Sequence, residues 1–310
     1  MAFKLGLVGL CTSHPNSWVP ILRNMVAEGQ LDLEIVAAWD SGETRPAGFA
    51  QEFCRKFDIP LAAEKMEDLI ERVDGVIIHT TNWDRHVEQA RPFVEADKSV
   101  LLDKPLAGNL RDLNRIADWV QTGARITGGS SLRCAPEIAE LMAQPAEERG
   151  EPHTAYMALG NDDYNYGIHG YAAFCGLFGG KVRSARYIGS SRQKHILLTW
   201  ADGSQALYTC GESAWLPFKM TVVTTKNTHA LGLTRFYETF LGQVMPYLCD
   251  PDRDPPFAPD EWMAPEMAAL AARQSWLHGG REVFLTDLSL DDPGFDGHRF
   301  AADYRRKRLS

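Results

Sequence analysis

The sequence predicts an α/β protein of two domains: a doubly wound parallel sheet in residues 1–127, and an α+β domain in residues 128–310 with a mostly antiparallel open sheet. Three observations predict this class. The first 127 residues alternate short apolar strands with amphipathic helical stretches. Beyond them the strands are longer, follow one another directly and alternate apolar with polar residues. A length of 310 residues is sufficient for two hydrophobic cores.

The strands of the first domain are short apolar runs, as expected of a sheet that helices cover on both faces. Val76, Ile77 and Ile78 are one example, with three β-branched residues in succession. We expect strands at residues 3–10, 33–39, 61–62, 76–78, 100–102 and 125–127.

The helices between these strands carry apolar residues at three- and four-residue spacing. The first lies within residues 15–28. Because proline cannot lie deep inside a helix, Pro20 predicts that the regular part begins only near Ser17 or Val19. The others are expected at residues 47–57, 66–73, 86–96 and 110–122, with Asn109 as the N-cap of the last.

Alternating strands dominate the second domain. Asp202-Gly203 is a pair typical of a two-residue hairpin turn. We expect strands at residues 153–159, 182–190, 195–200, 205–211, 218–225 and 282–285, and helices at residues 136–143, 233–248 and 259–277. One face of this open sheet has no helix assigned to it, so we expect a homodimer or homotetramer to cover it.

Charge and apolar runs restrict the possible partners. The net charge is −9 and the pI about 5.5, so no nucleic-acid partner is expected. The basic run at residues 305–308 is best explained as a solvated or oligomer-contacting tail. The apolar N-terminal stretch is too short to span a membrane and has no cleavage site, so we expect a cytoplasmic protein with no membrane partner.

The six cysteines are scattered along the chain and form no C-x-x-C pair. Neither a disulfide framework nor a zinc site is indicated by this spacing. We therefore expect buried free thiols and no metal.

The stretch from Asp74 to Ala107 is predicted to form strand, helix and strand, and it ends in Asp103-Lys104-Pro105. A lysine just past a strand lies at the carboxyl edge, where open α/β sheets bind ligands. This stretch resembles the glucose–fructose oxidoreductase/inositol dehydrogenase family (Gfo/Idh/MocA), which carries Glu-Lys-Pro at this place. The resemblance implies that Lys104 contacts both the nicotinamide and the substrate.

The second domain extends the resemblance. Residues 165–169, followed by residues 176–179, are similar to the family's Asp-x-x-x-His helix start and its terminating glycine. Residues 266–279 are similar to its Ala-rich helix, which ends in Ser-x-x-x-Gly. Since the motifs agree in order and spacing, the resemblance implies a Rossmann domain before residue 128 and a substrate-binding and oligomerisation domain after it.

The loop after the first strand departs from the dinucleotide fingerprint G-x-G-x-x-G, whose glycines let backbone N–H groups approach a pyrophosphate. Only Gly9 remains, because Cys11 and His14 replace the second and third glycines. In compensation, Thr12 and Ser13 offer hydroxyl groups and His14 a charge-assisted bond to phosphate. The loop has either kept the dinucleotide through these groups or lost it, and we expect it to be kept.

Asp40 ends the second strand. An acidic residue there hydrogen-bonds the ribose hydroxyls of NAD and repels a 2′-phosphate, so we expect NAD rather than NADP. The alternative is a carboxylate that caps the turn Asp40-Ser41-Gly42.

Thr80, Thr81, Asn82 and Trp83 follow the fourth strand. The resemblance implies that this loop runs along the ribose and nicotinamide, with Asn82 as its hydrogen-bonding member and Trp83 as a stacking wall toward the substrate. His86 is also assigned to the cofactor side. A histidine satisfied within the helix N-terminus is the favoured alternative for His86, because that position disfavours the cationic form.

Oxidation of a secondary alcohol needs a base near the hydroxyl proton and a donor to the developing oxyanion, while hydride leaves to nicotinamide. In the resembling family a lysine, an aspartate and a histidine do this, and their positions hold Lys104, Asn165 and His169. Asn165 cannot relay a proton. We therefore expect His169 to act as acid/base and Lys104 as electrostatic stabiliser, with the roles exchanged if a dry pocket lowers the pKa of Lys104. The alternative for Lys104 is a surface lysine without a catalytic role, and the alternative for His169 is a histidine satisfied within the core.

Three further residues are assigned to the substrate. Tyr166 offers an aromatic surface for a sugar face, Asp163 a polar group for hydroxyls, and Arg133 a cation near the same cleft. The sequence thus predicts a NAD(H)-dependent oxidoreductase acting on a secondary alcohol or ketone of a sugar, cyclitol or similar small polar molecule.

Two other functions stay open. A redox-neutral lyase or epimerase that uses bound NAD transiently is favoured by Asn165 and by Ala172, which stands where the family often has a second aspartate. A binding protein without cofactor is favoured by Cys11 and His14 in the nucleotide loop.

Overall fold

The computed structural model describes residues 1–309, apart from the side chains at positions 260 and 309. The chain forms two compact units. Unit 1 consists of Met1–Gly129, Leu241–Pro256 and the residues from Asp296 onward, and unit 2 of Ser130–Phe240 and Phe257–Phe295. A single boundary after residue 127 was expected. The structure instead places two later segments, Leu241–Pro256 and the residues from Asp296 onward, in unit 1.

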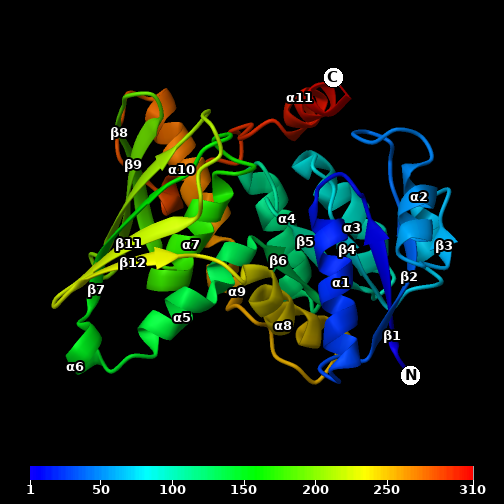
Figure 1. The fold of residues 1–310 in the computed structure, drawn as a ribbon. Helices are drawn as coiled ribbons and strands as arrows, with labels where there is room; N and C mark the ends of the chain where they lie inside the picture. Colours follow the sequence, from blue (N-terminus) through cyan, green and yellow to red (C-terminus); the bar gives the residue numbers. More distant parts are fainter. Residues whose placement is uncertain (310) are drawn as a thin grey trace. The chain divides into compact units, whose positions relative to one another are not determined.

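Unit 1 is built on a six-stranded parallel sheet in the order β3-β2-β1-β4-β5-β6 (Figure 1). The direction of winding reverses between β1 and β4, as in a doubly wound Rossmann sheet. The fold class expected for this half is confirmed. The strands are β1 (Phe3–Val8), β2 (Leu33–Trp39), β3 (Leu61–Ala62), β4 (Gly75–Ile78), β5 (Ser99–Asp103) and β6 (Ile126–Gly129).

The crossovers between these strands are helical, as parallel pairing requires. Asn109 caps one of them as expected, because its Oδ1 accepts a bond from the Asp112 N–H at 2.9 Å. A single 3₁₀ turn replaces the helix expected at residues 66–73, since β4 starts soon afterwards. The elements are α1 (His14–Ala27), α2 (Phe49–Lys56), η1 (Met66–Leu69), η2 (Trp83–Arg85), α3 (His86–Glu95) and α4 (Leu110–Gln121).

Helix α1 begins earlier than Pro20 predicted. It starts at His14, with Pro15 in its first turn, where a missing N–H is harmless. Pro20 itself is exposed inside the helix. The lost intrahelical bond is tolerated because Trp18 and Leu22 stay packed in the core.

The segment from Leu241 joins unit 1 through α8 (Phe236–Cys249). Arg125, just before β6, donates to the backbone oxygens of Tyr247, Asp250 and Pro251. Its guanidinium also lies 4.2 Å from the centre of the Tyr247 ring. A cation therefore meets the carbonyls that the end of α8 leaves without helical partners.

The basic run that was expected to form a solvated or oligomer-contacting tail belongs to a helix. Helix α11 (Gly297–Leu309) contains the basic run at residues 305–308 in its last turns, and these four side chains are exposed. The helix is anchored by Ala301, which is fully buried. Few apolar residues mark this segment, so its helical period was weak in the sequence.

Unit 2 is built on a seven-stranded sheet in the order β12-β11-β7-β10-β9-β8-β13. Only the β7–β10 pair is parallel, so the sheet is mostly antiparallel as expected. Tyr156, Leu207 and Leu197 stand in register across three strands, with Tyr156 exposed. The strands are β7 (Pro152–Ala158), β8 (Val182–Ser190), β9 (Lys194–Trp200), β10 (Gln205–Cys210), β11 (Lys219–Thr224), β12 (Thr228–Gly232) and β13 (Val283–Phe284).

The helices of unit 2 are interspersed among these strands. Edge strand β12 was not expected; it pairs with β11 by a short turn, so the following helix starts three residues late, at Phe236. The helix expected at residues 259–277 divides at Met263. The elements are η3 (Ser131–Cys134), α5 (Pro136–Met142), α6 (Ala146–Arg149), α7 (Ile168–Phe178), α9 (Pro259–Trp262), α10 (Ala264–Leu277) and η4 (Leu285–Asp287).

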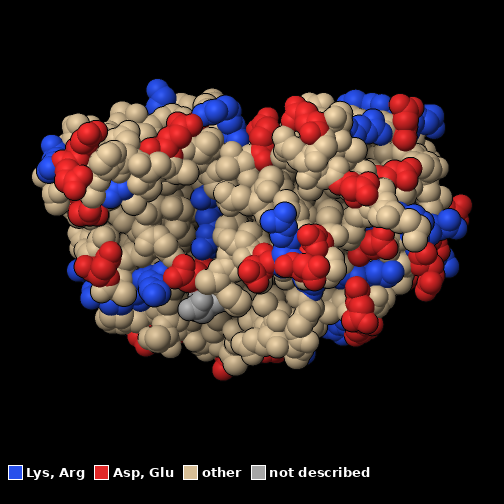
Figure 2. Space-filling model, turned by 90° about the horizontal axis from the view of Figure 1, so that it is seen from below, with Lys and Arg blue, Asp and Glu red and all other residues tan. Residues whose placement is uncertain are grey.

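All six cysteines are free thiols, and five of them are buried. Among the described helices, none is long and apolar enough to cross a membrane. On the face seen in Figure 2, acidic and basic side chains are intermingled and no broad basic area stands out. The expected homodimer or homotetramer stays a prediction.

Candidate active site

The loop after β1 comes into close contact with the loop after β4. Gly9 has a φ of +75°, and a Cβ at this position would lie only 2.4 Å from Thr80 Oγ1. Glycine is therefore required here both for the backbone conformation and for the approach of the two loops. This contact lies where the strand order of unit 1 reverses, which is the ligand-binding position of doubly wound sheets.

Cys11 fills space between neighbouring loops. Its Sγ lies 4.0 Å from Asp40 Oδ2, and the side chain is fully buried. Burial, with the charge of Asp40, raises the pKa of this thiol, so it is neutral and unreactive. Thr12 Oγ1 accepts a bond from the His14 N–H at 3.1 Å, and Ser13 stands at the N-cap of α1 without a side-chain capping bond.

His14 was expected to offer a bond to phosphate, but its Nδ1 lies 2.6 Å from Asp103 Oδ2. His79 Nδ1 lies 3.1 Å from the same oxygen. No sequence pattern indicates this cluster, because its members come from the start of α1, the residue after β4 and the last residue of β5. The His14 ring also stacks on Trp18 at 5.1 Å, so its Nδ1 serves the interior of unit 1.

The cluster is an electrostatic unit. Burial alone would raise the pKa of Asp103, but the charge and hydrogen bond of His14, together with the hydrogen bond of His79, outweigh burial and hold that pKa well below its usual value. Burial lowers the pKa of His79, which is consistent with a neutral ring that donates from Nδ1. Two imidazoles and a carboxylate can also ligate a metal ion. The observed separations are those of direct hydrogen bonds.

Asp40 shows the capping geometry that was its alternative assignment. Its Oδ1 accepts a bond from Gly42 N–H at 2.8 Å, and its Oδ2 one from Leu10 N–H at 2.6 Å. The carboxylate therefore joins the turn after β2 to the loop after β1. A ribose bond to Asp40 stays a prediction.

The loop after β4 is buried. Thr80 and Thr81 are each 2% exposed, and Asn82 and Trp83 are no more exposed than that. Asn82 Nδ2 donates to Glu43 Oε1 at 2.8 Å and lies 2.9 Å from His298 Nδ1. The amide that was expected on the cofactor is thus engaged by residues of unit 1.

His86 corresponds to its structural alternative. Its Nε2 lies 2.7 Å from the backbone oxygen of Thr80, and its Nδ1 lies 3.1 Å from that of Leu106. Burial lowers the pKa of His86, so the ring is neutral and one of the two carbonyls receives the N–H. The histidine ties the loop after β4 to the segment that follows Lys104.

Lys104 immediately follows β5 at the carboxyl edge of the sheet, as predicted. It is 6% exposed, and its N–H donates to Asp103 Oδ1 at 2.7 Å. The carboxylate that holds the two histidines therefore also fixes the backbone of the lysine. A lysine in such a position has few conformations available, which suits a group that must meet one reacting atom.

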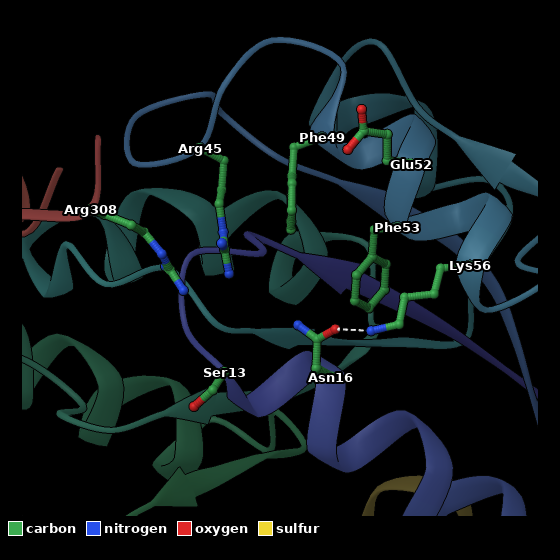
Figure 3. Close-up of a pocket in the computed structure, with 8 residues that line it drawn as sticks. All are labelled: Ser13, Asn16, Arg45, Phe49, Glu52, Phe53, Lys56 and Arg308. Carbon is green, nitrogen blue, oxygen red and sulfur yellow. Dashed lines mark hydrogen bonds between the residues drawn. The ribbon is translucent and has the colours of Figure 1, made fainter. Parts of the chain in front are cut away.

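A cavity of about 540 Å³ lies in unit 1 beside the start of α1. In Figure 3, Arg45 and Arg308 point toward one another at one side of it, and Lys56 bonds Asn16 Oδ1 at 2.8 Å. Burial, together with the charge of Arg308, lowers the pKa of Arg45. The cavity is lined by Ser13, Asn16, Arg45, Phe49, Glu52, Phe53, Lys56 and Arg308.

His169 of unit 2 is held by a partner that the sequence did not reveal. Its Nδ1 lies 2.7 Å from Ser130 Oγ, and the imidazole is 5% exposed. Tyr166 and Phe218 meet it edge-on at 5.4 and 5.5 Å. The hydroxyl can donate to Nδ1 or accept from it, so this contact holds the orientation of the ring whichever nitrogen carries the proton.

The other residues assigned in unit 2 have diverse surroundings. Asn165 is buried, three residues before α7. Asp163 forms a two-oxygen ion pair with Lys194 at 2.7 and 2.8 Å. Arg133 was expected to reach the substrate, but its guanidinium donates to the backbone oxygens of Glu261 and Trp262. Because a guanidinium suits carbonyl clusters, Arg133 binds the last carbonyls of α9 instead.

Comparison with known proteins agrees with this geometry. Residues 3–127 match the model of the Gfo/Idh/MocA oxidoreductase family, described as an NAD-binding Rossmann fold. Residues 3–127 belong to the Gfo/Idh/MocA family. The matched range ends within β6, so it contains the Gly9 loop, Asp40 and Lys104.

Curated relatives match part of the chain. The oxidoreductase YceM of Salmonella typhimurium is 28% identical over 139 residues, which are 44% of this chain and 42% of that protein. The trans-1,2-dihydrobenzene-1,2-diol dehydrogenase of Danio rerio is 34% identical over 112 residues, 35% of this chain and 31% of that protein. Each match thus spans less than half of the relative.

Solved structures match nearly the whole chain in fold. Scyllo-inositol dehydrogenase of Lactobacillus casei, solved with NAD(H) and scyllo-inositol, has a TM-score of 0.73 at 14% identity and covers 92% of this chain and 100% of its own. A probable dehydrogenase of Thermotoga maritima has a TM-score of 0.74 at 16% identity, with 92% and 100% covered. The fold of these two dehydrogenases is therefore shared over nearly the whole chain.

Proposed function

We propose that this protein is a NAD(H)-dependent oxidoreductase acting on a secondary alcohol or ketone of a sugar, cyclitol or similar small polar molecule. One observation carries the proposal: Gly9 packs on Thr80 where the strand order reverses, and Lys104 stands at the end of the adjoining strand. The NAD-binding family match supports the cofactor. The inositol dehydrogenases of the same fold support a polyol substrate.

The residues at the edge of unit 1 fit a dinucleotide in two respects. The tight turn at Gly9 brings the loop after β1 close to Thr80 at the reversal of strand order, where doubly wound sheets bind a dinucleotide. Asp40 stands at the end of β2, where a ribose is bound in such sheets. When bound, NAD would accept or return the hydride.

The chain's own residues would manage the proton. We assign His169 as the acid/base that exchanges a proton with the substrate hydroxyl through Nε2, while Ser130 positions the ring through Nδ1. Lys104 would stabilise the negative charge that develops on the substrate oxygen. Tyr166 and Phe218, beside His169, would offer apolar surface to the C–H face of a polyol.

Replacement of Lys104 tests this assignment. We expect Lys104→Met to lower turnover by about 100-fold or more, because a charge that stabilises the transition state is removed. The measurement is NADH formation from NAD⁺ with a panel of inositols and aldoses, alongside the matched variant Lys181→Met at an exposed position. Equal turnover of Lys104→Met and Lys181→Met would remove Lys104 from the mechanism.

A binding protein without cofactor is the second candidate, favoured by the engagement of Asn82 within unit 1. Titration with NADH and NADPH, followed by quenching of tryptophan fluorescence, separates the two. Saturable binding with NADH preferred supports the oxidoreductase. The titration uses both the full chain and a chain that lacks α11 (Gly297–Leu309). If neither chain binds either nucleotide, the oxidoreductase assignment is wrong.

A further inference from the structure

Helix α11 begins against the loop that follows β4. Asp84 Oδ2 accepts bonds from the N–H groups of Gly297 and His298, at 2.7 and 3.1 Å. His298 Nδ1 lies 2.9 Å from Asn82 Nδ2. A Cβ at Gly297 would lie 2.8 Å from Asn82 Oδ1, so only glycine permits this approach. The start of the helix is thus fitted to the loop by backbone and side chain together.

The first turns of α11 also cover an aromatic side chain of that loop. The rings of Phe300 and Trp83 are 5.0 Å apart and tilted by 33°. Ala301 is fully buried, and Tyr304 continues the aromatic row 5.9 Å from Phe300. Because Trp83 is only 2% exposed, one of its faces is already occupied.

The end of α11 contacts the loops after β1 and β2. Arg308 donates to the backbone oxygen of Cys11, and Arg305 to that of Glu43 at 3.3 Å. Arg308 also lies near Arg45, as Figure 3 shows, and the two like charges oppose each other. This end of the helix is therefore held by few bonds and against a repulsion.

The thirteen residues of α11 thus connect the loops after β4, β2 and β1. These are the loops that surround the reversal of strand order, where a doubly wound sheet binds its dinucleotide. The Asn82 amide was expected to meet the cofactor, and the Trp83 face was expected to form a stacking wall toward the substrate. The Asn82 amide cannot bond α11 and a nucleotide at the same time.

We propose that α11 is an intramolecular strap that occupies the dinucleotide crevice and must be displaced for the cofactor to bind. The inference rests on the proposed function, since it assumes that a dinucleotide binds at this edge. The strap is releasable because a single helix makes its contacts with the loops after β1, β2 and β4. The helix is held by the buried Ala301, by the contact of Phe300 with Trp83 and by the capping of its first turn. Its last turn is repelled by Arg45.

Removal of the strap is the first test. A chain that ends at Phe295 and the full-length chain are titrated with NADH, with circular dichroism to show that both are folded. We expect the shortened chain to bind about 5- to 150-fold more tightly, the usual range of coupling between two sites. Equal affinities would overturn the strap and leave the oxidoreductase intact. Absence of binding to both chains would overturn the strap and the proposed function together.

Point variants provide the test if the shortened chain does not fold. Phe300→Ala removes the contact with Trp83, whereas Arg299→Ala alters an exposed side chain of the same helix. We expect NADH affinity to increase at least several-fold for Phe300→Ala and to stay unchanged for Arg299→Ala. Weaker binding by Phe300→Ala would mean that α11 holds the cofactor instead of excluding it, and would overturn the proposal.

Limited trypsin digestion gives a measurement independent of affinity. The basic residues at 305–308 place cleavage sites inside α11. If NADH displaces the helix, it accelerates cleavage there, because proteases cut locally unfolded segments. Unchanged or slower cleavage at saturating NADH would show that the helix stays seated, and would overturn the strap.

Discussion

Replacement of Asp103 by asparagine is the most stringent test of how unit 1 is held together. One oxygen of this carboxylate faces Nδ1 of both His14 and His79, and the other accepts the N–H of Lys104. Asparagine has the same shape but only one acceptor oxygen. If that oxygen keeps the bond to Lys104, an NH₂ group faces the two imidazole donors.

The expected cost follows from these bonds. A hydrogen bond to a charged group contributes about 1.5–3 kcal/mol, and two such bonds are lost. Because the histidines share one oxygen, the two losses are not fully additive, so we expect a decrease of about 3–5 kcal/mol in the free energy of unfolding, as found when a buried charge loses its partner. The midpoint of thermal unfolding should fall by about 6–20 °C.

Urea and thermal unfolding of Asp103→Asn should be compared with those of Asp254→Asn, which alters an exposed carboxylate and is expected to have no effect. Far-UV circular dichroism at low denaturant shows whether the variant is folded. A loss below about 1 kcal/mol, close to that of an ordinary neutral bond, would refute the reasoning. It would mean that the imidazoles turn to other acceptors at little cost.

Two further predictions concern pH and the docking of α8. Burial lowers the pKa of His79; the nearby Asp103 acts in the opposite direction, and His14 and His86 lower this pKa further. Burial also lowers the pKa of His86. The unfolded chain therefore takes up protons first as pH falls through about 6.5, and stability should decline from there with a slope of at most about 1.4 kcal/mol per pH unit for each histidine. Thermal midpoints that stay flat between pH 7 and pH 5 would contradict the decline expected from the histidines. The low pKa of Asp103 adds a second decline below about pH 4, and the same decline in Asp103→Asn would contradict its assignment to this carboxylate. Arg125→Lys should destabilise unit 1 by about 2–3 kcal/mol, because an ammonium cannot reach the three carbonyls that the guanidinium bonds, whereas Arg115→Lys at an exposed site should have no effect. Equal unfolding midpoints for these two variants would show that Arg125 contributes nothing measurable.

Much of the fold could be predicted because local signals were unambiguous. The apolar run at Val76–Ile78 became β4, and the Asp202-Gly203 pair became the turn between β9 and β10. Strand β12 was missed because its side chains alternate between intermediate and exposed positions at the sheet edge, so no apolar run marks it. Pro20 misled the prediction of α1, since core packing by Trp18 and Leu22 outweighs one lost backbone bond.

The site was predictable in part for a similar reason. Lys104 could be placed at a strand end because strand ends are marked locally, by Pro105 after the apolar run. His79, Ser130 and His298 gave no such sign. Each obtained its role from a residue at least 24 positions away: Asp103, His169 and Asn82 respectively. Such pairs are decided by packing, and neither periodicity nor spacing encodes them.

The sequence by itself determined the doubly wound sheet, the mostly antiparallel second sheet and the place of Lys104. These follow from hydrophobic period, turn residues and chain order, which act over a few residues at a time. Tertiary structure alone decided that His14 bonds Asp103 and that α11 lies on the loops after β1, β2 and β4. The physical reason is that several segments, distant in sequence, could each bond the same buried polar group or cover the same surface. Only the folded chain shows which distant segment occupies it.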